Sequence, residues 1–156
     1  MHLNPSCFTN CFSMEIRCPN SAQEWEDYYN LRYLVLRKPW NQIPGSEKDD
    51  LEHLGVHRAA YLHGRIAGVG RLDNVDETTA QIRFMAVSET FQGQGIGSAL
   101  LEALENEAWH MGKKKVLLHA REIALNFYGK AGYELLHKSH LLFGEIQHFL
   151  MQKKKG

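Results

Sequence analysis

Cysteine is scarce in this chain and is confined to one end of it. Only three cysteines occur among 156 residues, at Cys7, Cys11 and Cys18. An odd number with no partner elsewhere argues against a disulfide framework and favours a reducing compartment, so we expect a cytoplasmic protein. The spacing of Cys7 and Cys11 could serve a metal ion, but no second pair of ligands matches it, and we expect no metal.

A surplus of charge of either sign is also missing. Lysine plus arginine and aspartate plus glutamate both number 18, which leaves a net charge of zero. Non-specific binding of nucleic acid depends on excess positive charge, so we expect no nucleic-acid partner. The lysine runs at Lys113–Lys115 and Lys153–Lys155 are more typical of solvated surfaces.

Long apolar runs are absent as well, and we expect no membrane partner because a spanning helix needs about 20 apolar residues. The segment Met1–Ser13 has neither the basic start nor the apolar stretch of a secretory signal. It is polar and differs from the remainder, so we expect residues 1–13 to be a flexible extension. Hydrophobic residues make up 44% of the chain, which suits a single domain over residues 14–156.

What the chain does contain is a glycine-rich hexapeptide between two regular elements. Gln92-Gly93-Gln94-Gly95-Ile96-Gly97 follows a strand-like run from Gln81 to Val87 and opens into a helix-like run, Ser98–Met111. The first N–H groups of a helix have no partner inside it and carry partial positive charge. Glycine also lets the backbone approach a phosphate closely, so the segment predicts a phosphate-bearing ligand.

Two familiar glycine loops do not fit this hexapeptide. A Rossmann fingerprint needs glycine or alanine at its sixth position, where counting from Gly93 gives Ser98 and counting from Gly95 gives Leu100. A P-loop needs a lysine after its last glycine, and none follows. What remains is Q-x-x-G-x-G, read as Gln92, Gly95 and Gly97, which resembles the acyl-CoA pyrophosphate loop of the GNAT superfamily of N-acyltransferases.

A second segment at the expected distance strengthens the resemblance. Arg83–Glu105 is similar to the family's strand, glycine loop and helix, and Leu117–Leu136 is similar to its next strand, helix and strand. The resemblance implies an acetyl-CoA-dependent N-acetyltransferase that uses no metal. It implies direct attack, in a ternary complex, by a primary amine of a small molecule, peptide or protein.

The patterns along the chain predict an α/β fold. Strands are expected at Glu15–Cys18, Ala59–Leu62, Arg65–Leu72, Ala80–Val87, Lys115–His119, Tyr133–Lys138 and about His148–Gln152. Helices are expected from the Ser21 cap to about Arg37, from Ser46 or Glu47 to about Leu54, over Ser98–Met111 and over Glu122–Ala131. The order β-α-α-β-β-β-α-β-α-β-β predicts a mixed, mostly antiparallel sheet of six to seven strands with about four helices. The family resemblance implies that this sheet splays open between its fourth and fifth strands.

The resemblance also assigns the cofactor contacts and the acid. Backbone groups of Met85, Ala86 and Val87 would pair with the pantetheine arm as an added strand does. Tyr128 would contact coenzyme A and protonate the leaving thiolate. The remaining implied cofactor contacts are the loop residues Gln92, Gly93, Gln94, Gly95, Ile96, Gly97 and Ser98, together with Asn126.

The general base is left open by the sequence. An alkylamine with a pKa of about 10.4 is neutral in only about one molecule in 2,500 at pH 7, a handicap of about 4.6 kcal/mol. Some family members use a glutamate on the fourth strand, and the matching position here is Gln81, which cannot accept the proton. His119 has a suitable intrinsic pKa and is our candidate, with Glu122 or a water relay as alternatives.

The sequence gives few signals for the acceptor site. By resemblance it would be lined by Arg32, Arg37, Trp40 and the segment Glu47–His53. Arg71 or Arg83 could bind a substrate carboxylate, although ordinary surface salt bridges are the expected role. His53 and His57 are four residues apart, but Gly55 and the lack of a third ligand argue against a metal site there.

Three further questions stay open at this point. The apolar segment from His140 to Met151 could be core or the interface of a homodimer. Because Gln81 replaces a carboxylate, the chain could instead be a non-catalytic module that binds or senses acyl-CoA. A small α/β domain without a coenzyme A site is the third alternative.

Overall fold

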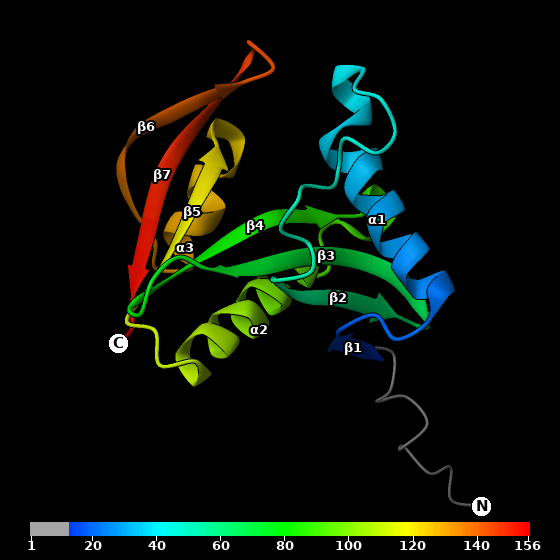
Figure 1. Ribbon diagram of the computed structural model, residues 1–156, viewed down its shortest axis with the longest axis horizontal. Coiled ribbons are helices and arrows are strands. Elements are labelled where there is room, and N and C mark those ends of the chain that lie inside the picture. Colours follow the sequence, from blue (N-terminus) through cyan, green and yellow to red (C-terminus); the bar gives the residue numbers. More distant parts are fainter. Residues whose placement is uncertain (1–12) are drawn as a thin grey trace, which may run out of the picture.

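The computed structural model describes residues 13–156, so the expectations for residues 1–12, including the Cys7 and Cys11 pair, lie outside it. One seven-stranded sheet runs through the described part in the order β1-β2-β3-β4-β5-β7-β6 (Figure 1). Among the strands of residues 13–156 only β4 and β5 pair in parallel, so the predicted mixed, mostly antiparallel sheet is confirmed. The strands are β1 (Met14–Arg17), β2 (Val56–Leu62), β3 (Arg65–Asn74), β4 (Thr79–Val87), β5 (Lys115–Arg121), β6 (Glu134–Leu142) and β7 (Ile146–Lys154).

In the described part of the chain, three α-helices cover the two faces of this sheet (Figure 1). Helix α1 (Ala22–Leu36) packs its buried side on β2, β3 and β4. Helices α2 (Ile96–His110) and α3 (Leu125–Lys130) share the core on the opposite face. Short 3-10 turns occupy η2 (Lys38–Trp40), η3 (Glu89–Phe91) and η4 (Glu122–Ala124), so the helix predicted from Glu122 is a 3-10 turn followed by α3. No helix within residues 13–156 has the length and apolar character needed to cross a membrane.

Helix α1 begins where its capping residues predict. The Ser21 side chain accepts a hydrogen bond from the Glu24 backbone N–H at 3.1 Å. The Glu24 carboxylate accepts from the Asn20 N–H at 3.0 Å and pairs with Arg17 at 2.6 Å. The predicted cap is therefore confirmed, with Arg17 of β1 tying the helix to the sheet.

The predicted second helix over Ser46–Leu54 is wrong, because this segment forms a series of turns. Asp49 Oδ1 accepts from the Leu51 N–H at 2.9 Å, and Glu52 Oε2 accepts from the Asp49 N–H at 3.0 Å. Such local bonds offer the backbone an alternative to helical hydrogen bonds. The order over residues 13–156 is therefore β-α-β-β-β-α-β-α-β-β, with three α-helices in this range instead of about four.

Two charged residues expected at the surface are buried. Arg71 is 0% exposed and forms salt bridges with Asp49 at 2.8 Å and Asp73 at 2.7 Å. Lys113 donates its ammonium to Asn74 Oδ1 and to the Asp76 carbonyl oxygen. Burial of a cation is stabilised by such partners, which adjacent sequence does not reveal.

One apolar position of α2 also differs from its prediction. Met111 is the last residue of the helix predicted over Ser98–Met111, yet it follows the last helical residue and is 43% exposed. Leu100, Leu101, Leu104 and Ala108 form the buried stripe instead.

The sheet splays between β4 and β5, as the family resemblance implies. These strands pair only at Thr79, Ala80 and Gln81 of β4, whose partners are Lys115, Val116 and Leu117 of β5. Beyond Gln81 the edge of β4 that faces β5 has no strand partner among the described residues. The fork leaves room for a ligand between the two strands.

A β-bulge interrupts β4 within this fork. Val69 pairs with Ala86 and Arg71 pairs with Arg83, so Phe84 and Met85 together face the single residue Gly70. Phe84 has a φ of 56°, in the left-handed region that aromatic residues rarely adopt. An extra residue reverses the side-chain alternation, and Met85 consequently packs on the α2 face of the sheet.

Candidate active site

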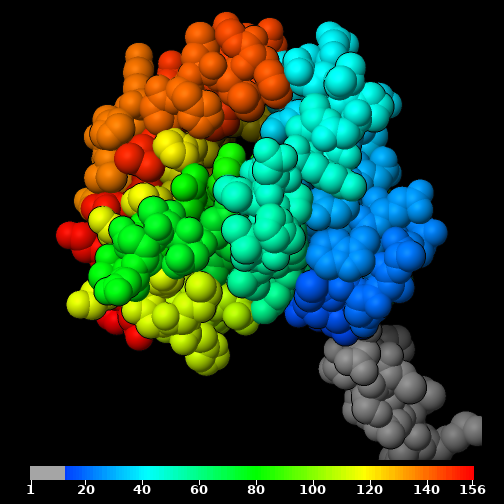
Figure 2. Space-filling model, in the orientation of Figure 1, coloured from blue at the N-terminus to red at the C-terminus, as the bar shows by residue number. Residues whose placement is uncertain are grey.

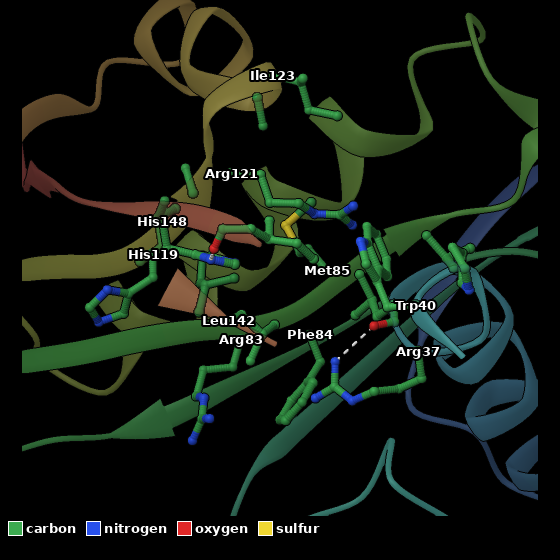
Figure 3. A pocket seen from close by; sticks show the side chains of 18 of the residues that line it. Arg37, Trp40, Arg83, Phe84, Met85, His119, Arg121, Ile123, Leu142 and His148 are labelled. Carbon is green, nitrogen blue, oxygen red and sulfur yellow. Dashed lines mark hydrogen bonds between the residues drawn. The ribbon is translucent and has the colours of Figure 1, made fainter. Parts of the chain in front are cut away.

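A cleft of about 1140 Å³ occupies the fork between β4 and β5. Helix α1 and η2 form one wall, and β5, β7 and η4 form the other (Figure 3). Cations dominate its charged lining, which among the described residues consists of Arg37, Lys38, Arg83, Arg121 and a single acid, Glu89. Since the whole chain is neutral, positive charge is concentrated at this cleft.

The turn between β6 and β7 reaches across the mouth of the cleft. The ring centroids of Trp40 in η2 and Phe143 in this turn lie 6.4 Å apart. Figure 2 shows the orange surface around the turn meeting the cyan surface that follows α1. The Arg121 guanidinium lies 5.0 Å from the Trp40 ring, so Trp40 lines the cleft wall.

The glycine loop leads from the end of β4 into α2. Gly95 occupies the N-cap position with a φ of 78° and makes no side-chain cap. The Ala99 N–H donates to the Gly95 carbonyl oxygen at 3.1 Å, which is the first hydrogen bond between α2 and the loop. A Cβ at Gly97 would come within 3.3 Å of the Phe127 ring, so glycine permits the approach of α3. The first turn of α2 therefore presents backbone N–H groups beside the cleft.

Tyr128 joins α3 to the bulged strand. Its hydroxyl lies 3.9 Å from Met85 Sδ, and its ring makes edge contacts with Phe127 and Tyr133. Burial raises the pKa of Tyr128 to about 12, although the nearby Arg121 opposes the shift. The phenol therefore holds its proton at neutral pH and can donate it.

His119 lies on β5, on the face opposite the buried residues Leu118 and Ala120. Its Nδ1 is 2.8 Å from Ser139 Oγ on β6. Burial lowers the pKa of His119, and the neighbouring His140 and His148 lower it further. A histidine with a lowered pKa is mostly neutral at pH 7 and can accept a proton.

His119 is the first of three neighbouring imidazoles. The rings of His119 and His140 lie 5.1 Å apart, and those of His140 and His148 stack at 4.4 Å. Burial is also the main cause that lowers the pKa of His148. Within residues 13–156 no group of three or more histidine, cysteine, aspartate or glutamate side chains is arranged to hold a metal ion.

The predicted cofactor residues fall into two groups. Met85, Gln92 and Tyr128 line the cleft. The others flank it, either on the loop and first turn of α2 (Gly93, Gln94, Gly95, Ile96, Gly97, Ser98), at the end of β4 (Ala86, Val87) or on α3 (Asn126).

Of the residues predicted to act as the base or to bind the acceptor, some line the cleft and others do not. Gln81, His119, Arg37, Arg83 and Trp40 line the cleft. Those outside the lining are Glu122, which is exposed; Arg32, which is fully buried; and Glu47–His53. His57 is buried, with its ring nitrogens 2.8 Å from the Tyr28 hydroxyl and 2.6 Å from the Glu52 carbonyl oxygen.

Sequence reasoning missed several cleft residues, among them Phe84, His140 and His148. Phe84 lines the cleft because of the bulge, and no local sequence pattern predicts that bulge. His140 and His148 reach it through the pairing of β6 with β7. The concentration of histidines near the end of the chain was the one available signal.

Comparisons with known proteins agree with this geometry. Residues 22–133 match the model of the Acetyltransferase (GNAT) family. The chain is 28% identical over 133 residues to "Uncharacterized N-acetyltransferase YjcF" of Bacillus subtilis, which covers 85% of this chain and 94% of the relative.

Two solved structures share the fold. A GNAT family acetyltransferase from Elizabethkingia anophelis, with acetyl-CoA bound, aligns with a TM-score of 0.70 at 19% identity over 94% of this chain and 99% of its own. An acyl-CoA N-acyltransferase from Pseudomonas aeruginosa aligns with a TM-score of 0.75 at 23% identity over 91% and 99%. The forked sheet, its glycine loop and the family match together show that this chain belongs to the GNAT acetyltransferase family.

Proposed function

We propose that this protein transfers an acetyl group from acetyl-CoA to a primary amine by direct attack in a ternary complex. The amine belongs to a small molecule or to a peptide or protein, and residues 14–156 act as one catalytic domain. The observation that carries the proposal is the fork between β4 and β5, which brings the Tyr128 hydroxyl, His119 and the unpaired edge of β4 to one cleft.

The residues around the cleft fit coenzyme A. The free edge of β4 at Met85–Val87 offers backbone partners to an extended pantetheine arm. Gly95 and Gly97 keep side chains away from the N-terminus of α2, where the N–H groups suit a pyrophosphate. Gln92, the other loop residues through Ser98, and Asn126 complete the set that we assign to the cofactor.

His119 is the group that we assign to deprotonating the amine. In the tautomer with its proton on Nδ1, the ring donates to Ser139 Oγ and keeps a lone pair on Nε2. Its lowered pKa keeps that lone pair available at neutral pH. The positive lining of the cleft also favours the neutral form of a bound amine.

Tyr128 is the group that we assign to protonating the leaving sulfur. Acetyl-CoA supplies an acetyl thioester, whose C–S bond breaks as the C–N bond to the amine forms. Backbone N–H groups of β4 can donate to the thioester oxygen as it gains charge. The Tyr128 hydroxyl then gives its proton to the thiolate.

A second candidate function is a non-catalytic module that binds or senses acyl-CoA. Gln81 favours it, because this cleft residue on β4 cannot accept a proton. The module would show coenzyme A binding with no turnover across a broad panel of amines. A neutral His119 and a protonated Tyr128 within one cleft favour catalysis instead.

Thermal unfolding with and without acetyl-CoA tests the proposal first. Ligand at a hundred times its Kd should stabilise the fold by about 2.7 kcal/mol, which raises Tm by several degrees. Release of free thiol on addition of amines then separates the enzyme from the binding module. An unchanged Tm at millimolar acetyl-CoA contradicts both functions.

A further inference from the structure

One aromatic ring in the cleft gathers four arginines. The guanidinium carbons of Arg32, Arg71, Arg83 and Arg37 lie 4.4, 4.9, 5.0 and 5.7 Å from the centroid of Phe84. Such a concentration of like charge is stable only when anions neutralise it. The carboxylates around this ring therefore show which of the four charges are already compensated.

Two of the four arginines have their partners within the protein. Arg32 pairs with Glu52 at 2.9 Å, and Arg71 pairs with Asp49 at 2.8 Å. Both side chains are fully buried behind the bulge and contribute nothing to the cleft lining. Arg71 also pairs with Glu52 at 2.8 Å, so the two arginines share one carboxylate.

The other two arginines line the cleft, and their charges are less well compensated. Arg37 is half-buried and donates Nε to the Ser46 carbonyl oxygen and Nη1 to that of Leu36, both neutral acceptors. Within residues 13–156 no carboxylate forms a salt bridge with it, and the nearby Glu47 accepts from the Gly45 N–H. Arg83 lies 3.4 Å from Asp49, which Arg71 already engages more closely.

The geometry points to an acceptor that carries a carboxylate beside its amino group, with the carboxylate held by Arg37 and Arg83. This inference rests on the proposed acetyl transfer and names the class of amine. Figure 3 shows both side chains beside Phe84, within the cleft. A guanidinium with one nitrogen still uncommitted matches a singly charged carboxylate, and Arg83 adds a second positive charge.

The positive charge of the cleft lining supports the same class of acceptor. Four arginine and lysine side chains line it against Glu89 alone, so an amine with a second positive charge is repelled. A carboxylate on the acceptor attracts the molecule into this field while its amino group stays free for His119. Polyamines are therefore predicted to be poor substrates.

Matched acceptors test the inference by kcat/KM. The pairs are glycine with ethylamine, β-alanine with propylamine, γ-aminobutyrate with butylamine, and aspartyl-alanine amide with asparaginyl-alanine amide. The carboxylate should raise kcat/KM about tenfold or more in at least one pair. The kcat/KM for putrescine should be lower than that for butylamine. The kcat/KM for aminopropylphosphonate should not be more than tenfold higher than that for γ-aminobutyrate.

Substitutions link that preference to the two arginines. Arg37→Gln should reduce the ratio of kcat/KM between the carboxylate-bearing amine and its match to about one. Arg83→Gln should lower this ratio severalfold, and it replaces a side chain that is not buried. Arg58→Gln is the control, because Arg58 pairs with Glu107 outside the cleft lining and should leave the preference unchanged. Circular dichroism and Tm confirm that each variant folds.

The outcomes separate the inference from the proposed function. If amines are acetylated but no pair shows the preference, or if both arginine variants retain it, the inference alone is overturned. Loss of the acetyl-CoA-dependent rise in Tm in Arg37→Gln would assign Arg37 to the cofactor and also overturn it. If neither acetyl-CoA binding nor acetylation of any amine is detected, the proposed function fails and the inference fails with it.

Discussion

The Tyr128 hydroxyl lies 3.9 Å from Met85 Sδ, so the short helix α3 and the bulged strand β4 meet at the floor of the cleft. Met85 points there because the extra residue at Phe84 reverses the alternation of β4. This contact places a protonated phenol beside the strand edge that we assign to the thioester arm.

Tyr128→Phe should lower kcat by one or more orders of magnitude, because the leaving thiolate loses its proton donor. The ring remains, so acetyl-CoA should still raise Tm as in the wild type. Release of free thiol with a saturating amine measures the effect. Tyr33→Phe is the control, since the Tyr33 hydroxyl donates to the Gln42 carbonyl oxygen outside the cleft lining. Full activity in Tyr128→Phe would show that the assigned acid is wrong.

The pH dependence of kcat/KM should report His119. A general base works in its neutral form, and burial lowers the pKa of His119 below its ordinary value of about 6.5. Activity attributable to this base should therefore persist at pH 7 and decline only as the pH falls below about 6.5. His119→Gln should remove that acidic limb and lower kcat by about 100-fold or more.

A variant of a second histidine, outside the cleft lining, is the control for this prediction. His110 is exposed at the end of α2, and His110→Gln should leave both the rate and the profile unchanged. A wild-type acidic limb that survives in His119→Gln would point to a water relay in place of this histidine.

Gly95→Ala should weaken acetyl-CoA binding, because a Cβ enters the loop at the N-terminus of α2 and the φ of 78° becomes strained. The strain should also destabilise the fold by about 1–2 kcal/mol. Gly112→Ala, at the other end of α2 with a φ of 80° and open space around it, carries the same strain without touching the loop. Calorimetric titration with acetyl-CoA should show a higher Kd only in Gly95→Ala. Equal affinities in both variants would remove the loop from the cofactor site.

Arg71→Ala should lower the free energy of unfolding by about 3–5 kcal/mol, because it leaves a cluster of carboxylates without its buried cation. Arg58→Ala breaks a half-exposed pair with Glu107 and should cost less than about 1 kcal/mol. Urea unfolding of both variants gives the comparison. Similar losses would mean that the Arg71 network is no more stabilising than a surface pair.

Local sequence signals determined much of this protein. The Ser21 cap and the Gln92–Gly97 loop each act within a few residues, and the helices that follow them form near the predicted positions. The periodicity of the strands and the order of elements were enough to predict the mixed sheet. These features depend on backbone preferences and on apolar spacing, which adjacent residues carry.

Tertiary structure decided the features that depend on distant partners. Asp49 and Glu52 lie in turns in place of the predicted helix, and the same carboxylates that bond the local backbone also pair with Arg71 and Arg32, which lie far away in the sequence. The register of β3 and β4 creates the bulge at Phe84, and only then do Arg37 and Arg83 gather around that ring. Charge compensation and strand register are long-range interactions, so the chemistry of the cleft emerges only when the sheet is assembled.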